Sequence, residues 1–94
     1  MNKVIELNFK SSLNKLAGNK FGERIYNEQI KEKVDFKNKV VIVFPDIIDD
    51  IAISFVQGFT KEILEKIPKS EFFEYFSLKG NPKVIDKFKK SLFY

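Results

Sequence analysis

The sequence predicts a small α/β domain in which helices pack on a largely parallel sheet. The run Val40–Phe44 is apolar, mostly β-branched and bounded by turn formers, which is typical of a strand covered on both faces. Extended and helical patterns also alternate along the chain in the order β-α-β-α-β-α, and such alternation favours parallel strands with right-handed crossovers. The length of 94 residues suffices for one core, so residues 1–94 are expected to form a single domain.

The first half of the chain is expected to supply one strand and one helix before the central strand. Residues 3–9 alternate apolar and polar side chains, which predicts a half-exposed strand at or near a sheet edge. Residues 10–20 are compatible with a short helical turn or an irregular loop, and the pattern does not choose between them. The segment Phe21–Val34 repeats apolar residues at helical spacing, so we expect the first helix there.

The second helix is expected to follow the central strand after an acidic turn. Ser54 and Gln57 have the spacing of a capping box, so the serine hydroxyl is predicted to cap the helix N-terminus. The apolar residues of the segment 55–67 share one broad face, and Pro68 ends the helix. Because a helix N-terminus presents free N–H groups and partial positive charge, this end is the first place to look for chemistry or regulation.

The last third of the chain predicts a strand, a turn and a third helix. The aromatic-rich segment Glu71–Leu78 has the composition of a strand. Asn81 and Pro82 then provide an N-cap and a proline at the first helical position. The apolar residues of this helix are expected to point inward and its lysines outward: Val84, Ile85, Phe88 and Leu92 against the charged face.

Composition argues against an enzyme, a metal centre or a cofactor. The chain has no cysteine and no histidine, which removes disulfides, thiolate metal sites and the usual general base, and suits a reducing cytoplasm. No nucleotide-binding glycine motif is present. Asp46, Asp49 and Asp50 are of the right type for Mg²⁺, but we prefer to explain them as a solvated turn whose charge favours the helix that follows, and we predict no metal site.

The chain is also not expected to enter a membrane. No apolar run approaches the roughly 18 residues that a membrane-spanning helix needs. The first nine residues alternate in polarity and include Glu6, a pattern that does not fit a signal peptide. We therefore expect a cytoplasmic protein without a membrane partner.

The formal net charge of +4 arises from 17 basic and 13 acidic residues, and most of the excess lies near the C-terminal end. The lysines concerned are Lys79, Lys83, Lys87 and Lys90, together with Lys89. A basic helix face usually serves solubility, but it also suits nucleic acid. The alternative function is therefore a small protein, of host or mobile-element origin, that binds nucleic acid or inhibits a nucleic-acid-processing enzyme through this helix.

Three segments together form a pattern of helix start, buried strand and second helix start: GNKFGERIYNEQI (Gly18–Ile30), VVIVFPDI (Val40–Ile47) and ISFVQGF (Ile53–Phe59). In their order and spacing they resemble the STAS-like family, a group of small bacterial domains similar to the sulphate-transporter and anti-sigma-factor-antagonist (STAS) domains. The tail EYFSLKGNPKVIDKF is similar to the family's last strand, turn and helix, so the likeness covers roughly residues 18–92. The resemblance implies a STAS-like α/β fold and a regulatory role through protein contacts.

The resemblance also assigns a site. In the antagonists a serine at the strand-to-helix turn is phosphorylated by a partner kinase, and Ser54 is the matching position. We therefore expect a non-enzymatic interaction module that contacts a protein partner through Asp49, Asp50, Ser54, Gln57 and Lys61, with Ser54 as the candidate phosphorylation site. Neither the identity of the partner nor the oligomeric state follows from the sequence.

Overall fold

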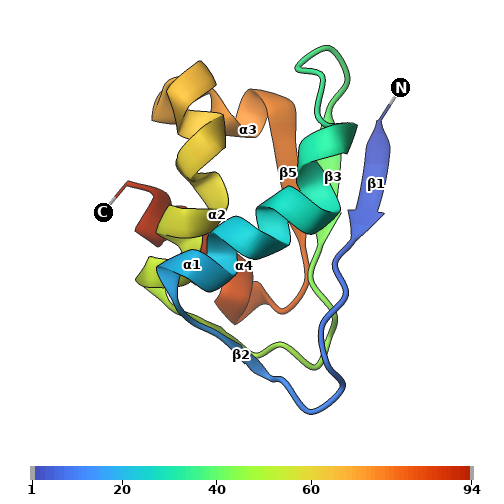
Figure 1. Cartoon of the computed structure of the whole chain (residues 1–94), viewed down its shortest axis with the longest axis vertical. Coiled ribbons are helices and arrows are strands. Elements are labelled where there is room, and N and C mark those ends of the chain that lie inside the picture. The colour runs from blue at the N-terminus through green and yellow to red at the C-terminus, as the bar shows by residue number, and fades with distance from the viewer. Residues whose placement is uncertain (1, 94) are drawn as a thin grey trace.

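The computed structural model describes residues 2–93, and its centre is a parallel sheet of three strands in the order β1-β3-β5 (Figure 1). The strands are β1 (Lys3–Glu6), β2 (Lys15–Leu16), β3 (Val40–Val43), β4 (Asp50–Ile51) and β5 (Phe76–Lys79). The α-helices are α1 (Asn19–Ile25), α2 (Ile53–Lys66), α3 (Phe72–Tyr75) and α4 (Pro82–Leu92). The predicted α/β class, the parallel sheet and the edge position of the first strand are confirmed.

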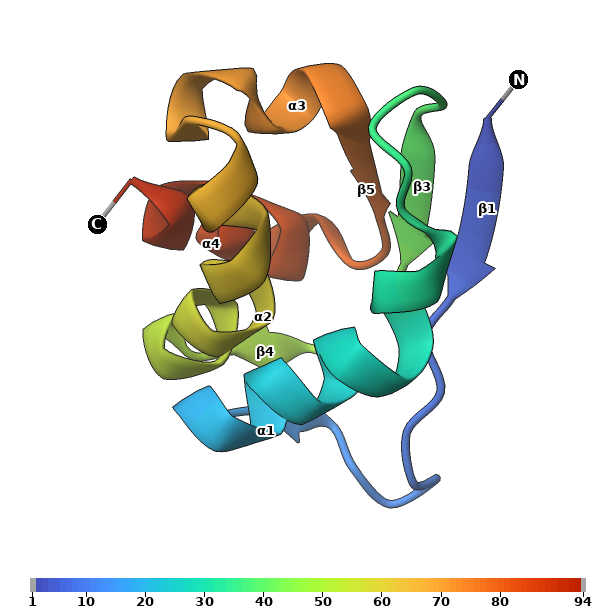
Figure 2. The same ribbon diagram turned by 45° about the horizontal axis from the view of Figure 1, so that its top comes forward.

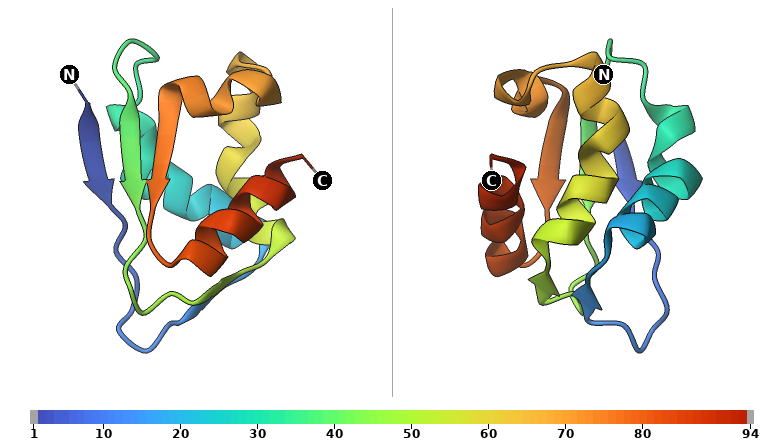
Figure 3. Two further views of the ribbon diagram at one scale, coloured as in Figure 1. Left: turned by 180° about the vertical axis from the view of Figure 1, so that it is seen from behind. Right: turned by 60° about the vertical axis from the view of Figure 1, so that its left-hand side comes forward.

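The helices cover one face of this sheet and leave the other open. Ile5, Ile42 and Phe76 point toward the helices and are buried in the core. Val41 and Val43 point the opposite way, and no helix of residues 2–93 lies over them, as the view from behind shows (Figure 3). The prediction that the central strand is covered on both faces was therefore wrong.

The topology explains the open face. The chain steps from β1 to β3 to β5 in one direction across the sheet, and right-handed crossovers that step in one direction place their helices on the same side. Helix α4 then packs on α2 and does not pass behind the strands (Figure 2). We call the open side the reverse face; its side chains are Val4, Glu6, Val41, Val43, Ser77 and Lys79.

The first helical segment is longer and less regular than predicted. It begins at Asn19 with α1, widens into a π-helical turn over Tyr26–Ile30 and ends in a 3-10 turn over Lys31–Lys33. The apolar spacing located the helix correctly but carried no sign of the wide turn, since the four-residue spacing of Tyr26 and Ile30 fits a regular helix as well as a π-helical turn.

Helices α1 and α2 touch backbone to backbone at two glycines. A Cβ on Gly58 would overlap the carbonyl oxygen of Asn19 and lie 2.7 Å from its carbonyl carbon. A Cβ on Gly22 would overlap the carbonyl oxygen of Phe55 and lie 2.8 Å from the amide nitrogen of Phe59. Only glycine allows helices this close, so these two positions fix the helix pair on which the rest of the core is built.

Six phenylalanines belong to that core. Phe55, Phe59, Phe72, Phe76 and Phe88 are fully buried, and the ring contacts among them run from α2 across α4 to β5. An aromatic-rich composition that is unremarkable in the sequence therefore becomes one connected cluster in the fold.

Two predicted segments differ from the structure. Of the expected strand Glu71–Leu78, only its second half is extended; a 3-10 turn over Lys69–Glu71 and the short α3 precede β5. Burying Phe72 at the end of α2 favours a helical turn over the aromatic strand propensity. Residues 10–20, left open by the sequence, contain β2, which pairs in parallel with β4.

The end of α2 and the start of α4 agree with the sequence signals. Helix α2 ends at Lys66, two residues before Pro68. Asn81 caps α4 by accepting a hydrogen bond from the backbone N–H of Lys83 at 2.9 Å, with Pro82 at the first helical position. Both terminal signals are local, which is why they could be predicted from a few residues.

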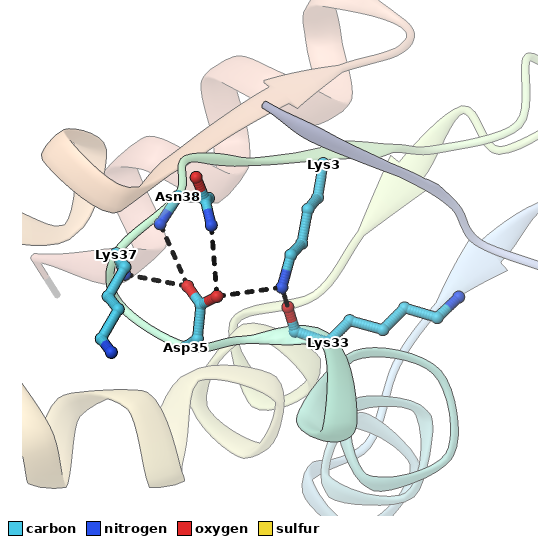
Figure 4. Close-up of polar contacts among 5 residues, drawn as sticks. All are labelled: Lys3, Lys33, Asp35, Lys37 and Asn38. Carbon is cyan, nitrogen blue, oxygen red and sulfur yellow. Dashed lines mark hydrogen bonds and ion pairs between the residues drawn. The ribbon is translucent and has the colours of Figure 1, made fainter. Parts of the chain in front are cut away.

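The connection between the first helical segment and β3 is held by Asp35 (Figure 4). One carboxylate oxygen accepts hydrogen bonds from the backbone N–H groups of Lys37 and Asn38, and the other accepts from the ammonium group of Lys3 at 3.1 Å. This arrangement holds Phe36 in the left-handed region at a φ of 57°. The N–H bonds, and then Lys3, keep the pKa of the Asp35 carboxyl well below its ordinary value.

We expect the Asp35→Asn variant to lose part of the pH dependence of stability. Because the folded-state pKa is lowered, the carboxylate stabilises the fold above the unfolded-state pKa of about 4, and this contribution is lost as the pH falls toward the folded-state pKa. Asparagine keeps one acceptor oxygen but does not titrate. Denaturant unfolding between about pH 7 and pH 2 should show a shallower fall for the variant below about pH 4. Superimposable profiles would contradict this role.

Candidate functional site

Ser54 does not cap α2. The N-cap is Ala52, and Ser54 is the second residue of the helix, without a side-chain capping bond. Its hydroxyl oxygen instead accepts a hydrogen bond from the backbone N–H of Gly18 at 3.0 Å, in a half-buried position. The capping box predicted with Gln57 was therefore wrong, because the start of α1 competes for the serine oxygen. Phosphorylation of Ser54 stays a prediction, and it would have to break the contact with Gly18.

Asp50 also has partners within the molecule. Its carboxylate accepts a hydrogen bond from the ammonium group of Lys87 at 2.9 Å and from the backbone N–H of Ile51, and Lys15 lies 3.7 Å away. The bond from Lys87, followed by that from Ile51, lowers the pKa of the Asp50 carboxyl. Asp50 thus joins α4 to the small β2–β4 sheet, while Asp49 stays exposed beside it.

The remaining predicted contact residues lie farther along α2. Gln57 is exposed, and Lys61 pairs with Glu23 of α1 at 3.3 Å. Lys61 lines a polar groove of about 280 Å³ between the first helical segment and α2, where Lys31 and Glu62 form a second ion pair at 3.1 Å. The five predicted residues therefore lie on both sides of the start of α2, and two of them, Asp50 and Lys61, are already paired with opposite charges.

Some lysines of the basic helix α4 are likewise paired with carboxylates within the molecule. Lys87 pairs with Asp50, and Lys90 pairs with Asp86 at 3.2 Å on the same helix. Lys79 and Lys83 are exposed. The predicted nucleic-acid face thus has fewer free amines than its lysine count suggests, which lowers the electrostatic attraction to phosphates.

No group of three potential metal ligands occurs among residues 2–93, because the aspartates of the acidic turn do not converge. Across the same residues, no helix combines the length and the apolar character required to cross a bilayer.

A further cavity lies in a region that we did not predict. It has a volume of about 560 Å³ and lies between α1, the π-helical turn and the segment that follows β1. We call it the α1 cavity; its lining residues are Asn8, Phe9, Lys10, Leu13, Phe21, Arg24, Ile25, Glu28 and Gln29. Its lining combines four apolar residues with five polar or charged ones. Binding sites usually join an apolar surface to polar groups that orient the ligand.

The walls of the α1 cavity are held by one side-chain amide. Gln29 accepts a hydrogen bond from the backbone N–H of Asn8 and donates one to its carbonyl oxygen, both at 2.8 Å. These bonds tie the segment after β1 to the π-helical turn. Wide turns of this kind are frequent at functional sites because they redirect side chains that a regular helix would place elsewhere.

The floor and rim of the α1 cavity differ in chemistry. The rings of Phe9 and Phe21 meet edge to face at 6.1 Å, and Phe21 continues into the buried ring of Phe55 at 5.5 Å. Above this floor, the guanidinium of Arg24 lies 5.0 Å from the centre of the Phe21 ring, and its Nε is 3.9 Å from the Glu28 carboxylate. The cavity therefore offers half-buried aromatic surface beside a cation.

Comparisons with protein-family models, with curated proteins and with solved structures find no match for this chain. The geometry of its own residues therefore carries the functional argument. Part of the α1 cavity is lined by the segment Phe21–Val34, where the sequence predicted the first helix. Phe21 and Arg24 in that segment were the available sequence signal for this cavity. The helical spacing of the apolar residues, however, only indicated that the helix packs on the core.

Proposed function

We propose that this chain is a non-enzymatic regulatory module that binds a protein partner through the α1 cavity. The observation that carries the proposal is the half-open cavity of about 560 Å³ with an aromatic floor. Such a floor suits an apolar side chain of a partner, which is how a few anchor residues supply most of the binding energy of protein interfaces. The regulatory role follows the resemblance to the STAS-like family.

The charges at the rim indicate which partner segment fits best. Lys10 and Arg24 contribute two positive charges, and Glu28 contributes one negative charge. The excess of positive charge favours a carboxylate beside the inserted apolar side chain. The expected ligand is therefore a peptide segment with an aromatic or large aliphatic residue next to an acidic residue.

Panning a phage-displayed random peptide library against the wild-type chain tests this proposal. The enriched peptides should combine an apolar residue with Asp or Glu, and the Arg24→Glu variant should bind them about tenfold more weakly in fluorescence anisotropy. Arg24 is largely exposed, so the reversal should change the free energy of unfolding by at most about 1 kcal/mol.

The Lys20→Glu variant is the matched control. Lys20 is an exposed cation on the same helix but does not line the cavity, so this variant should bind the peptides nearly as well as the wild type. Equal losses in both variants would point to general electrostatics and count against the cavity. A library that yields no binding peptide would count against the proposed function itself.

A further inference from the structure

The reverse face of the sheet is a small surface with two ordered rows of side chains. The strand register places Val4, Val41 and Ser77 in one row and Glu6, Val43 and Lys79 in the next. Val4 is 64% exposed, while Val41, on the middle strand, is only 7% exposed. The centre of the face is thus apolar, and this part of the chain has no helix to cover it among residues 2–93.

The charges on this face lie at opposite edges of one row. Glu6 is on β1 and Lys79 is on β5, with Val43 between them on β3. Strands about 4.8 Å apart place the Cα atoms of the two charged residues about 10 Å from each other, and their side chains do not pair across Val43. Neither side chain has an oppositely charged partner within 4.0 Å in the described part of the chain.

We propose that the reverse face binds a second copy of this chain, sheet against sheet, about a two-fold axis parallel to the strands. This operation sets β1 of one copy over β5 of the other and β3 over β3. Glu6 of each copy then faces Lys79 of its partner, so one operation forms two ion pairs around the central valines. A two-fold axis across the strands would instead set β1 over β1 and β5 over β5, without this pairing.

The geometry of sheet packing is compatible with such a dimer. Two sheets that stack face to face lie about 10 Å apart with their strands aligned to within about 30°. The aligned arrangement is the one that keeps each Glu6 opposite a Lys79 along the whole row. Because the strands contribute only four residues each, the buried area falls well short of the roughly 800 Å² per partner of a stable interface. We therefore expect weak, reversible association at protein concentrations of about 0.1–1 mM.

The positive charge of Lys39 opposes the dimer and provides a further test of the proposal. Lys39 precedes β3 and is exposed at the amino-terminal end of the face, where the two-fold axis sets it near its own copy. Like charges across an interface weaken it. The Lys39→Gln variant should therefore associate more strongly than the wild type.

Charge reversal tests the dimer. We expect wild-type chains to associate in sedimentation velocity at low salt up to about 1 mM, and to dissociate as salt screens the pairs. The Glu6→Lys and Lys79→Glu variants should each associate at least about tenfold more weakly, because each brings like charges together. Their equimolar mixture should form a heterodimer, and the doubly reversed variant should regain self-association.

Circular dichroism and thermal unfolding of each variant establish that it is folded. The doubly reversed variant contains both substitutions in one chain, so its self-association would also show that neither substitution prevents folding. Wild-type protein that stays monomeric at low salt would overturn the proposal. So would single variants that associate like the wild type, or a mixture that fails to associate when both single variants have lost association. The Arg24→Glu variant should dimerise normally, so failure of the dimer and failure of the α1 cavity are separate results.

Discussion

Replacing Gly58 by alanine should destabilise the protein by about 3 kcal/mol, although alanine is the better helix former by about 1 kcal/mol. The added Cβ would overlap the carbonyl oxygen of Asn19, a backbone atom that cannot rotate away. Helices α1 and α2 would have to separate, and the aromatic contacts between them would loosen. Urea unfolding followed by circular dichroism measures the loss.

The neighbouring Gln57→Ala variant is the control for this prediction. Gln57 lies on the same helix but is exposed, so alanine there raises the helix propensity slightly without a clash. Its free energy of unfolding should stay within about 0.5 kcal/mol of the wild type. A Gly58→Ala variant that is as stable as the Gln57→Ala variant would show that α1 and α2 do not touch as described.

Replacing Phe59 by alanine should cost about 3–5 kcal/mol, which is enough to unfold much of a small domain. Its ring stacks on Phe55 with centroids 5.7 Å apart and meets Tyr26 and Phe88 edge to face at 6.0 and 6.1 Å. One side chain thus joins the π-helical turn, α2 and α4. Thermal unfolding of the variant should show a much lower midpoint and a broader transition.

The Phe93→Ala variant is the matched control for Phe59→Ala, because it makes the same substitution at an exposed position. Phe93 is 60% exposed near the end of the chain, so Phe93→Ala removes the same atoms without opening a cavity in the core. We expect a change within about 0.5 kcal/mol. Similar losses for Phe59→Ala and Phe93→Ala would mean that Phe59 is not at the centre of the core.

The parts of the fold that the sequence predicted are those with local causes. The apolar run at Val40–Phe44, the cap at Asn81 and the stop at Pro68 each depend on a few adjacent residues, and all three are found where expected. Coverage of the sheet was mispredicted because it depends on the direction in which the chain steps between strands. A continuous apolar run contains no information about that direction.

The candidate site was harder to predict because its residues meet through long-range contacts. The serine at position 54 and the acidic turn carried the expected chemistry, but Gly18 and Lys87 approach them from 36 and 37 residues away. The α1 cavity likewise depends on Gln29 bonding to Asn8 across 21 residues and on a π-helical turn. No pattern within a single helix or strand signals either arrangement.

The two proposed surfaces use different sides of the same sheet. The α1 cavity lies on the side that carries the helices, and the reverse face lies on the other. A weak dimer would present two cavities at once, and linking two binding sites raises the apparent affinity for a partner that can reach both. Partner binding and self-association could therefore reinforce each other without sharing a contact residue.

The most direct test is an NMR titration of the ¹⁵N-labelled chain with a peptide selected from the library. A partner segment in the α1 cavity should shift the backbone amide signals of Phe9, Leu13, Phe21, Arg24 and Gln29, and should leave those of α4 and the reverse face in place. Shifts confined to α4, to the reverse face or to the start of α2 would contradict the proposed site.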